Sequence, residues 1–459
     1  MKSKIRSIYV LRPLLFFCFF SAQILAQGQL RREGIAYATD ADWMSILNLA
    51  KKENKYIFVD CYATWCNPCK RMDKDVFEND SVVDYINEKF VSVKIQFDTT
   101  SKDDKHVKQW HEIAKQFRVE YGINKFPTFL FFSPGGELVH EGAGYYNISD
   151  FFMLTSNAMN SQRQFHTLYK KYSSGIKDYS NMPYFINHAS ELGNQELVNV
   201  LIEDYKDNFL YKLPIDSLFT TERIIFLAQY LKTSKEKGFR IFNQYSDRTV
   251  EAFRYDSTLF KRFTNLPIRV IKYFAIKEDI LEKLWNNKIP ISESPNWDSF
   301  AFEISRKYIG HLNQNDIDSL IDDGKLRWYK WKQDWLMVAT IHANCLKKFG
   351  TRMDDIAVNT HAWNIFLYSN KKTELETALL YLSKFVIDKE FINPLQVSTE
   401  TDTYANLLYK LGRKDEALFW ENRAYELDCE RDRFLQVLTK MRSNEITWIY
   451  PIDRIILNE

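Results

Sequence analysis

The stretch Val59–Met72 reads VDCYATWCNPCKRM and places two cysteines, Cys66 and Cys69, where a buried strand meets a helix. The apolar run Tyr56–Tyr62 predicts the strand, and Pro68 suits the first helical turn because the N–H that proline lacks has no partner there. The free N–H groups and the dipole of that helix favour a thiolate at Cys66. Two intervening residues bring Cys69 close enough to attack a mixed disulfide at Cys66, so the pattern predicts thiol–disulfide exchange.

Two other features belong to the same expected site. Asp60 lies within the otherwise apolar strand, and a buried carboxylate is costly unless it has a role. Burial raises the pKa of such a carboxyl, which suits a proton acceptor for Cys69. We expect Lys94, in the middle of the apolar run Phe90–Ile95, to be the partner of Asp60 across the sheet. Phe126-Pro127-Thr128 precedes another apolar run, where a cis X–Pro bond is at home.

The surrounding residues alternate between strand and helix patterns. Ser133-Pro134-Gly135-Gly136 predicts a hairpin turn. Strands are expected at 56–62, 90–95, 128–132 and 137–141, and helices at 42–52, after Pro68, at 82–89, in the later part of 99–118 and at 148–159. The order β-α-β-α-β-β-α predicts a central sheet with helices on its faces.

At this point residues 36–160 resemble the thioredoxin fold. Trp65-Cys66-Asn67-Pro68-Cys69-Lys70 is similar to the active-site motif of that family, Asp60 matches its buried acid and Phe126-Pro127-Thr128 its cis-proline loop. Val76-Phe77, Val82 and Tyr85–Lys94 further resemble exported thioredoxin-like domains related to the C-terminal part of thiol:disulfide interchange proteins. Asn67 in place of the usual Gly, Phe126 in place of a smaller aliphatic residue and an apparent insertion at 99–112 depart from the pattern.

The resemblance implies a role for each matched residue. Catalytic roles fall to Cys66, Cys69, Asp60 and Pro127, substrate docking to Trp65, Phe126 and Thr128, and support to Asn67, Pro68, Lys70 and Lys94. The expected cofactor is none beyond the redox-active Cys66–Cys69 disulfide, with no metal. The expected partners are a protein or peptide disulfide and an upstream thiol electron donor.

The beginning of the chain resembles a secretory signal. Lys2, Lys4, Arg6 and Arg12 precede an apolar run over 14–25. At about 12 residues this run is too short for a membrane span of ~20 and suits a signal peptide cleaved after Ala26. We therefore expect a signal peptide at 1–26, a linker at 27–35 and a periplasmic protein without a membrane span. An uncleaved signal that anchors the protein, or secretion, are the alternatives.

Residues 161–459 give an almost entirely helical pattern. The expected fold class is thus an α/β thioredoxin fold followed by a larger all-α domain. Ala405, Ala417 and Ala424 fall where tetratricopeptide-like helix pairs, near 362–430, require small residues. An irregular helical domain is the alternative, and in either case this domain offers a surface for a protein partner.

Charge and cysteine usage exclude several classes of protein. The chain has 62 basic and 60 acidic residues, and without the four basic residues of 1–26 the balance is 58 against 60, so no basic footprint indicates nucleic acid. Cys61 is expected in the core, and Cys345 and Cys429 as free core thiols or a mutual bridge. The spacing of Cys61, Cys66 and Cys69 resembles the start of an iron–sulfur motif, but no fourth cysteine lies nearby. A zinc site with these thiols would need His106 or His111 as a further ligand.

These observations favour an exported thiol–disulfide oxidoreductase that reduces protein disulfides. Two alternatives stay open. One is a helical interaction or scaffold protein whose thioredoxin module is redox-sensitive or vestigial. The other is a disulfide isomerase, which needs the same cysteines together with a substrate-binding surface.

Overall fold

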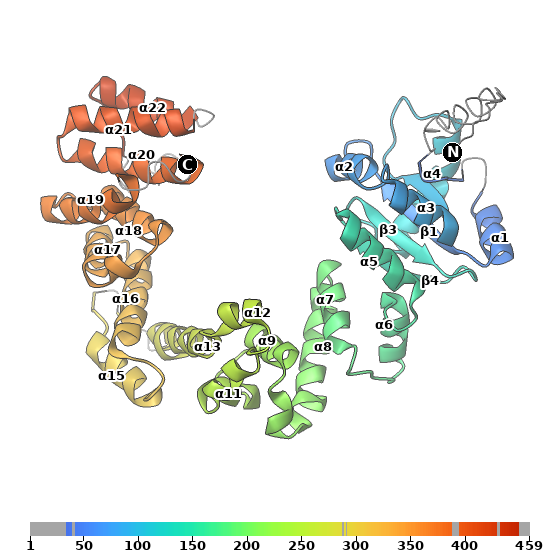
Figure 1. Cartoon of the computed structure of the whole chain (residues 1–459), viewed down its shortest axis with the longest axis horizontal. Helices are drawn as coiled ribbons and strands as arrows, with labels where there is room; N and C mark the ends of the chain where they lie inside the picture. Colours follow the sequence, from blue (N-terminus) through green and yellow to red (C-terminus); the bar gives the residue numbers. More distant parts are fainter. Residues whose placement is uncertain are drawn as a thin grey trace, which may run out of the picture. The chain divides into compact units, whose positions relative to one another are not determined.

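A computed structural model describes residues 34–38, 42–286, 289–290, 292–387, 394–428 and 432–448. The expected signal peptide, most of the linker and Cys429 lie outside these residues. The chain divides into two compact units between Leu213 and Pro214 (Figure 1). Each unit is described by itself.

Unit 1 begins with an α/β part and continues with three helices. Its elements are α1 Trp43–Glu53, β1 Tyr56–Tyr62, α2 Asn67–Asp75, α3 Asp80–Lys89, β2 Phe90–Gln96, α4 Lys105–Glu120, β3 Thr128–Phe132, β4 Leu138–Ala143, α5 Ile148–Met159, α6 Phe165–Ser173, α7 Met182–Glu191 and α8 Gln195–Asn208, with a 3₁₀ turn η1 at Leu210–Lys212. The strands lie in the order β2-β1-β3-β4, with β1 parallel to β2 and antiparallel to β3, and β3 antiparallel to β4. This is the expected thioredoxin fold.

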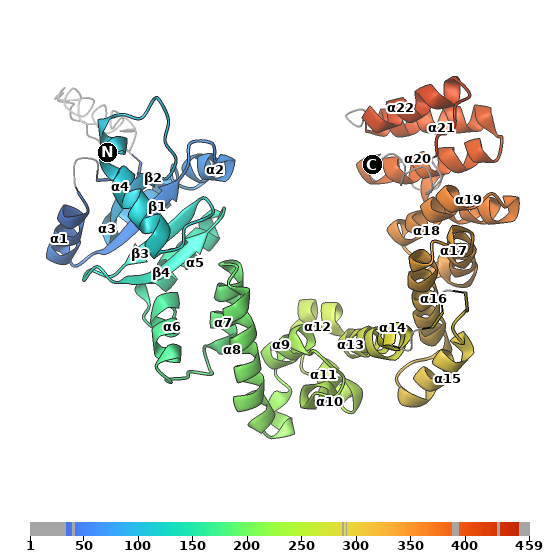
Figure 2. The ribbon, with the colours of Figure 1, turned by 180° about the vertical axis from the view of Figure 1, so that it is seen from behind.

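The side chains of β1 point alternately to the two faces of the sheet, and the core forms one layer on each face. Phe58 points to the face covered by α2, α3 and α5, where it stacks on Phe131 at 5.5 Å between ring centroids. Ile57 and Val59 point to the opposite face, which α1 and α4 cover. Figure 2 shows α4 crossing this second face. Successive side chains of a strand point to opposite sides, so one buried strand supplies both layers.

Helix α6 packs against β4, one of the two edge strands of the sheet, and α7 contacts β4 through His188. An uncovered edge leaves N–H and C=O groups unpaired. Here Nε2 of His188 lies 2.8 Å from the carbonyl oxygen of Glu141, and the N–H of Phe165 donates to Nδ1 of His140 at 3.0 Å. The compact unit therefore extends beyond the α/β part, as far as Leu213.

Unit 2 consists of helices within the described residues. They are η2 Ile215–Leu218, α9 Thr221–Tyr230, η3 Lys237–Phe239, α10 Arg240–Asn243, α11 Ser246–Glu251, α12 Ser257–Phe263, α13 Leu266–Phe274, the π-helix η4 Ala275–Glu282, α14 Lys283–Asn286, α15 Trp297–Lys307, α16 Gln314–Trp331, α17 Trp335–Phe349, η5 Gly350–Arg352, α18 Asp355–Tyr368, α19 Lys372–Val386, α20 Pro394–Lys410, α21 Lys414–Leu427 and α22 Asp432–Arg442. The expected all-α region is confirmed. No helix among the described residues is long and apolar enough to cross a bilayer.

The C-terminal helices of unit 2 pack around one apolar core. Ala405 on α20 and Ala417 and Ala424 on α21 are fully buried, as their small size suggested. The tetratricopeptide-like repeat itself stays a prediction. Cys345 is a buried free thiol whose Sγ lies 3.8 Å from Oδ2 of Asp322, and burial raises its pKa to about 12.

The stability of the contact between β4 and α6 should depend on pH because His140 can take up a proton. Its Nδ1 accepts a backbone N–H, its ring stacks on His188 at 4.5 Å, and burial together with His188 and His166 holds its pKa well below the usual value. The unfolded state therefore binds the proton more readily, and this contact loses stability as the pH falls below about 6.5.

We expect the hydrogen-exchange protection of α6 and α7, corrected for intrinsic rates, to fall by up to about tenfold per pH unit between pH 6.5 and 5. His140→Asn keeps an acceptor without the titrating ring and should flatten this dependence. His342→Asn, at another buried histidine, is the control. Equal slopes in the wild type and His140→Asn would assign the effect to another group.

Candidate active site

The two cysteines form a disulfide at the first turn of α2. Cys66 is the N-cap residue, and its Sγ accepts the backbone N–H of Cys69 at 3.1 Å. The side chains are buried, with 2% of Cys66 and 4% of Cys69 exposed, whereas Asn67, Pro68 and Lys70 are exposed. Backbone N–H groups and the helix dipole thus act on Cys66 as expected, and they stabilise negative charge on its sulfur.

Exposed Trp65 and half-buried Phe126 lie beside the disulfide and together form an aromatic shelf. Trp65 is 67% exposed and lies edge-on to Phe126, with 5.9 Å between the ring centroids. Phe126 packs against the buried cluster of Ala63, Cys66 and Cys69. The Phe126–Pro127 peptide bond is cis, as expected. Thr128 is buried and its hydroxyl donates to the carbonyl oxygen of Lys125 at 2.8 Å, so this side chain shapes the loop from within.

Asp60 and Lys94 lie directly opposite each other on β1 and β2. Lys94 Nζ is 3.4 Å from Oδ2 of Asp60, which is 2% exposed. Burial raises the pKa of Asp60 to about 6, with Lys94 opposing the rise and Asp73 adding to it. The structure therefore places the expected pair together. At neutral pH the carboxylate is mostly ionised and can accept a proton.

Asp73 is a member of this site that the sequence analysis missed. Lys94 also forms an ion pair with Asp73 on α2, which links the helix of the dithiol to β2. The Lys94 ammonium further lies 5.0 Å from the ring centroid of Tyr62 and 5.7 Å from that of Tyr37. Burial, followed by Asp60, raises the pKa of the Tyr37 hydroxyl. The only available signal was the spacing of Asp73, two turns beyond Cys66 on a predicted helix.

Two further contacts fix the loops around the disulfide. Thr64 donates its N–H to Oδ1 of Asp98 at 3.0 Å, which holds the loop after β1 against the loop after β2. Arg118 on α4 donates to the carbonyl oxygen of Phe97 at 2.8 Å and lies 5.6 Å from the Phe126 ring centroid. Sequence reasoning found neither contact, because both join residues that are distant along the chain.

The remaining cysteine and the histidines of this part take structural positions. Cys61 is a core residue whose pKa is raised by burial. His111 Nε2 lies 3.2 Å from Oδ2 of Asp103. Among the residues that the structure describes, no group of three His, Cys, Asp or Glu side chains is arranged to hold a metal ion.

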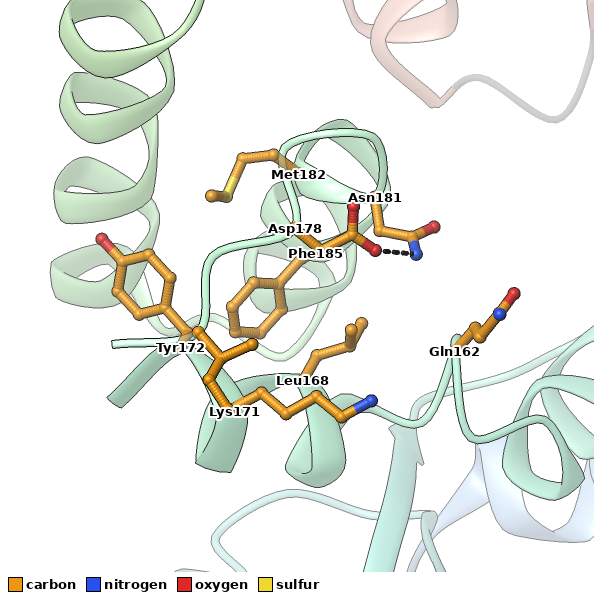
Figure 3. A pocket seen from close by; sticks show the side chains of 9 residues that line it. Gln162, Leu168, Lys171, Tyr172, Asp178, Asn181, Met182 and Phe185 are labelled. Atoms are coloured by element: carbon orange, nitrogen blue, oxygen red, sulfur yellow. Dashed lines mark hydrogen bonds between the residues drawn. The ribbon is translucent and has the colours of Figure 1, made fainter. Parts of the chain in front are cut away.

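A separate hollow lies between α6 and α7 (Figure 3). It has a volume of about 280 Å³ and is lined by apolar side chains such as Leu168 and Phe185, with Lys171 and Asp178 at its edge. Asp178 accepts a hydrogen bond from Nδ2 of Asn181 at 2.8 Å. None of the expected redox residues lines it, so it does not contribute to the dithiol site.

Comparison with known proteins places the α/β part in a family. Residues 45–158 match the thioredoxin-like domain. Thioredoxin H4 of Arabidopsis thaliana is 35% identical over 106 residues, which are 23% of this chain and 74% of that protein. Protein disulfide isomerase-like 5-2 of Oryza sativa subsp. japonica is 28% identical over 88 residues, 19% of this chain and 18% of that protein. A candidate disulphide isomerase from Bacteroides thetaiotaomicron has 31% identity over 28% of this chain and 96% of its own, with a TM-score of 0.24.

The chain thus belongs to the thioredoxin-like family of oxidoreductases, through a domain that contains the Cys66–Cys69 pair. The expected resemblance is confirmed. The matched region is about a quarter of the chain, so the activity, substrate and partners of the whole protein are taken up as proposals below.

The pKa of Asp60 predicts how the stability of unit 1 depends on pH. The pKa of this carboxyl rises from 3.8 to about 6 on folding, so the folded state binds the proton more tightly than the unfolded state. The free energy of unfolding is therefore highest below about pH 4, and it declines as the pH rises to about 6. Asp60→Asn should therefore increase the free energy of unfolding at pH 8 by about 1–3 kcal/mol and remove the decline between pH 4 and 6.

Hydrogen exchange of β1 and β2 in the oxidised protein measures this free energy. Asp80→Asn, at an exposed carboxylate in the first turn of α3, is the control and should leave the decline in place. A decrease in stability of Asp60→Asn at pH 8 would contradict the raised pKa and would mean that the Lys94 ion pair outweighs desolvation.

Proposed function

We propose that the chain is an exported thiol–disulfide oxidoreductase that reduces protein disulfides through Cys66 and Cys69. One observation carries this proposal: the Cys66–Cys69 disulfide stands at the N-terminus of α2, with Cys66 Sγ accepting the Cys69 N–H at 3.1 Å. The same N–H and helix dipole stabilise the thiolate after reduction. A stabilised thiolate is both the attacking group and a good leaving group in disulfide exchange.

The reaction proceeds in two exchanges. The Cys66 thiolate attacks one sulfur of the substrate disulfide, which forms a mixed disulfide and releases the other substrate sulfur as a thiolate. Cys69 then gives up its proton, for which we assign Asp60 as acceptor, and attacks Cys66 Sγ. This step releases the second substrate thiolate and restores the Cys66–Cys69 disulfide. The substrate gains two electrons, which an upstream dithiol returns to the protein.

The aromatic shelf supplies a docking surface for the substrate. Trp65 is exposed, its ring contacts that of Phe126, and Phe126 packs against the cluster that contains both cysteines. The indole ring is therefore available to a polypeptide whose disulfide reacts at Cys66. Aromatic rings offer large apolar contact at low entropic cost. The basic and apolar leader at 1–26 supports export to a periplasmic location.

Unit 2 supports a second role in partner binding. It is a compact unit with its own core, and large apolar side chains such as Phe419 on α21 and Leu380 on α19 are exposed. We propose that this unit selects the substrate or presents it to the dithiol.

A double variant, Phe419→Ser with Leu380→Ser, tests this role. We expect the variant to capture less protein substrate than the wild type while it reduces a small disulfide at the wild-type rate.

Cysteine substitutions test the reductase activity directly. In an insulin-reduction assay with dithiothreitol as donor, Cys66→Ser should abolish activity because the attacking sulfur is lost. Cys69→Ser lacks the resolving thiol. When it is reduced beforehand and mixed with substrate after dithiothreitol has been removed, it should accumulate a mixed disulfide between Cys66 and the substrate, visible by mass spectrometry. Cys61→Ser and Cys345→Ser replace buried thiols and are the controls, which should keep activity.

Retention of full activity by Cys66→Ser would overturn the proposal. Refolding of scrambled ribonuclease distinguishes an isomerase, which would restore native disulfides faster than it reduces insulin.

A further inference from the structure

A groove of about 600 Å³ lies between α5 and α7 of unit 1. Figure 1 and Figure 2 both show these two helices next to each other. One wall of this α5–α7 groove comes from the thioredoxin-like domain, with Tyr145 and Met153, and the other from α7, with Tyr184 and Glu191. Because α7 lies outside the matched residues 45–158, the second wall is particular to the helical extension.

The groove lies next to the dithiol site in the chain's hydrogen-bond network, and residues at its edge bond to the cis-proline loop and to α2. The N–H of Gly144 donates to the carbonyl oxygen of Pro127 at 2.8 Å, directly behind the cis-proline loop. The next residue, Tyr145, donates its hydroxyl to Oδ2 of Asp75 on α2 at 3.3 Å, and the Arg71 guanidinium lies 4.0 Å from its ring centroid. Tyr145 therefore joins α2, the helix that begins at the cysteines, to the wall of the groove formed by the thioredoxin-like domain.

Helix α7 is held against the same loop. Nζ of Lys125 donates to the carbonyl oxygens of Glu191 and Leu192, at 3.3 and 3.0 Å, at the C-terminal end of α7. Tyr184 donates its hydroxyl to the carbonyl oxygen of Arg163 at 2.7 Å. The two walls are thus fixed relative to the cis-proline loop, so the groove is a preformed surface.

The chemistry of the lining indicates what the groove binds. Tyr145, Tyr184 and Met153, which is 59% exposed, give an aromatic and thioether surface. Asp150 and Glu191 are the charged carboxylates of the lining, and no Lys or Arg is among the lining residues. Asp150 and Glu191 are both exposed. His188 Nδ1 lies 3.5 Å from Oε2 of Glu191, and Asp150 accepts a hydrogen bond from Nδ2 of Asn147.

We propose that the α5–α7 groove binds the polypeptide segment that flanks the substrate disulfide, and that it favours a segment with an apolar or aromatic residue next to Lys or Arg. This inference rests on the proposed reductase function. The apolar side chain packs against Met153 and the tyrosine rings, and the cation lies near Asp150 and Glu191. Such contacts give preference among substrates while leaving the sulfur chemistry at Cys66 unchanged.

The test compares two cyclic disulfide peptides and one small disulfide. The peptides carry the same flanking tyrosine followed by either Lys or Glu, and 2-hydroxyethyl disulfide is too small to reach the groove. In the full-length protein we expect a kcat/KM for the Lys peptide at least fivefold above that for the Glu peptide. Glu191→Lys should reverse this preference, and Met153→Ala should lower kcat/KM for both peptides about threefold.

Matched controls lie outside the groove. Glu196→Lys on α8 makes the same change of charge, and Met44→Ala on α1 removes another exposed methionine. Neither should change the preference. The small disulfide should be reduced at the wild-type rate by all four variants, which shows that the fold and the dithiol are intact.

The possible failures are distinct. If Glu191→Lys and Met153→Ala leave the peptide preference unchanged while reduction proceeds, the groove proposal is wrong and the reductase function stands. If the wild-type protein reduces neither the peptides nor the small disulfide, the reductase function itself is wrong. Equal losses with Glu196→Lys and Glu191→Lys would assign the preference to overall charge and overturn the groove.

Discussion

Strand β1 is paired along both edges and buried on both faces, and the arrangement of the site depends on it. Its parallel pairing with β2 places Asp60 opposite Lys94, and its antiparallel pairing with β3 places Asp60 opposite Phe129. Because the strand is fixed on all sides, the loop that leaves it delivers Cys66 to the N-terminus of α2 at a defined position. The thiolate-stabilising geometry is thus a consequence of how a single strand is packed.

A charged group inside that core also links the sheet to the redox helix. Lys94 pairs with Asp60 on β1 and with Asp73 on α2, so one ammonium contacts both elements that flank the dithiol. Burial raises the pKa of Asp60 while Lys94 limits the rise. Desolvation and the Lys94 counter-charge together set the pKa of this carboxyl at about 6, close to neutral pH. At such a pKa the carboxyl can exchange a proton during turnover.

The helical extension begins where the sheet would otherwise expose an edge. His188 contacts the backbone carbonyl of Glu141 on β4, the N–H of Phe165 donates to the His140 side chain of the same strand, and Lys125 binds the end of α7 to the loop before β3. An edge strand needs such cover to avoid pairing with another chain. The same packing brings an additional helix to the side of the thioredoxin-like domain that carries the cis-proline loop.

The strands, the first helix and the redox pair could be predicted from local signals along the chain. Tyr56–Tyr62 and Thr128–Phe132 have the predicted bounds, because continuous apolar runs bounded by turn residues are local signals. Cys66, Cys69 and the ion pair of Asp60 with Lys94 were also found this way, since spacing and a charge in an apolar strand can be recognised along the chain.

Contacts between residues that are far apart along the chain became known from the three-dimensional packing alone. Asp73, Asp98 and Arg118 contact the site from other elements, and nothing in their local sequence distinguishes them from solvated charges. The stacking of His140 on His188 likewise joins a strand to a helix about fifty residues later. Local periodicity shows which face of an element is buried, but three-dimensional packing selects the partner, and so it determined the second wall of the groove.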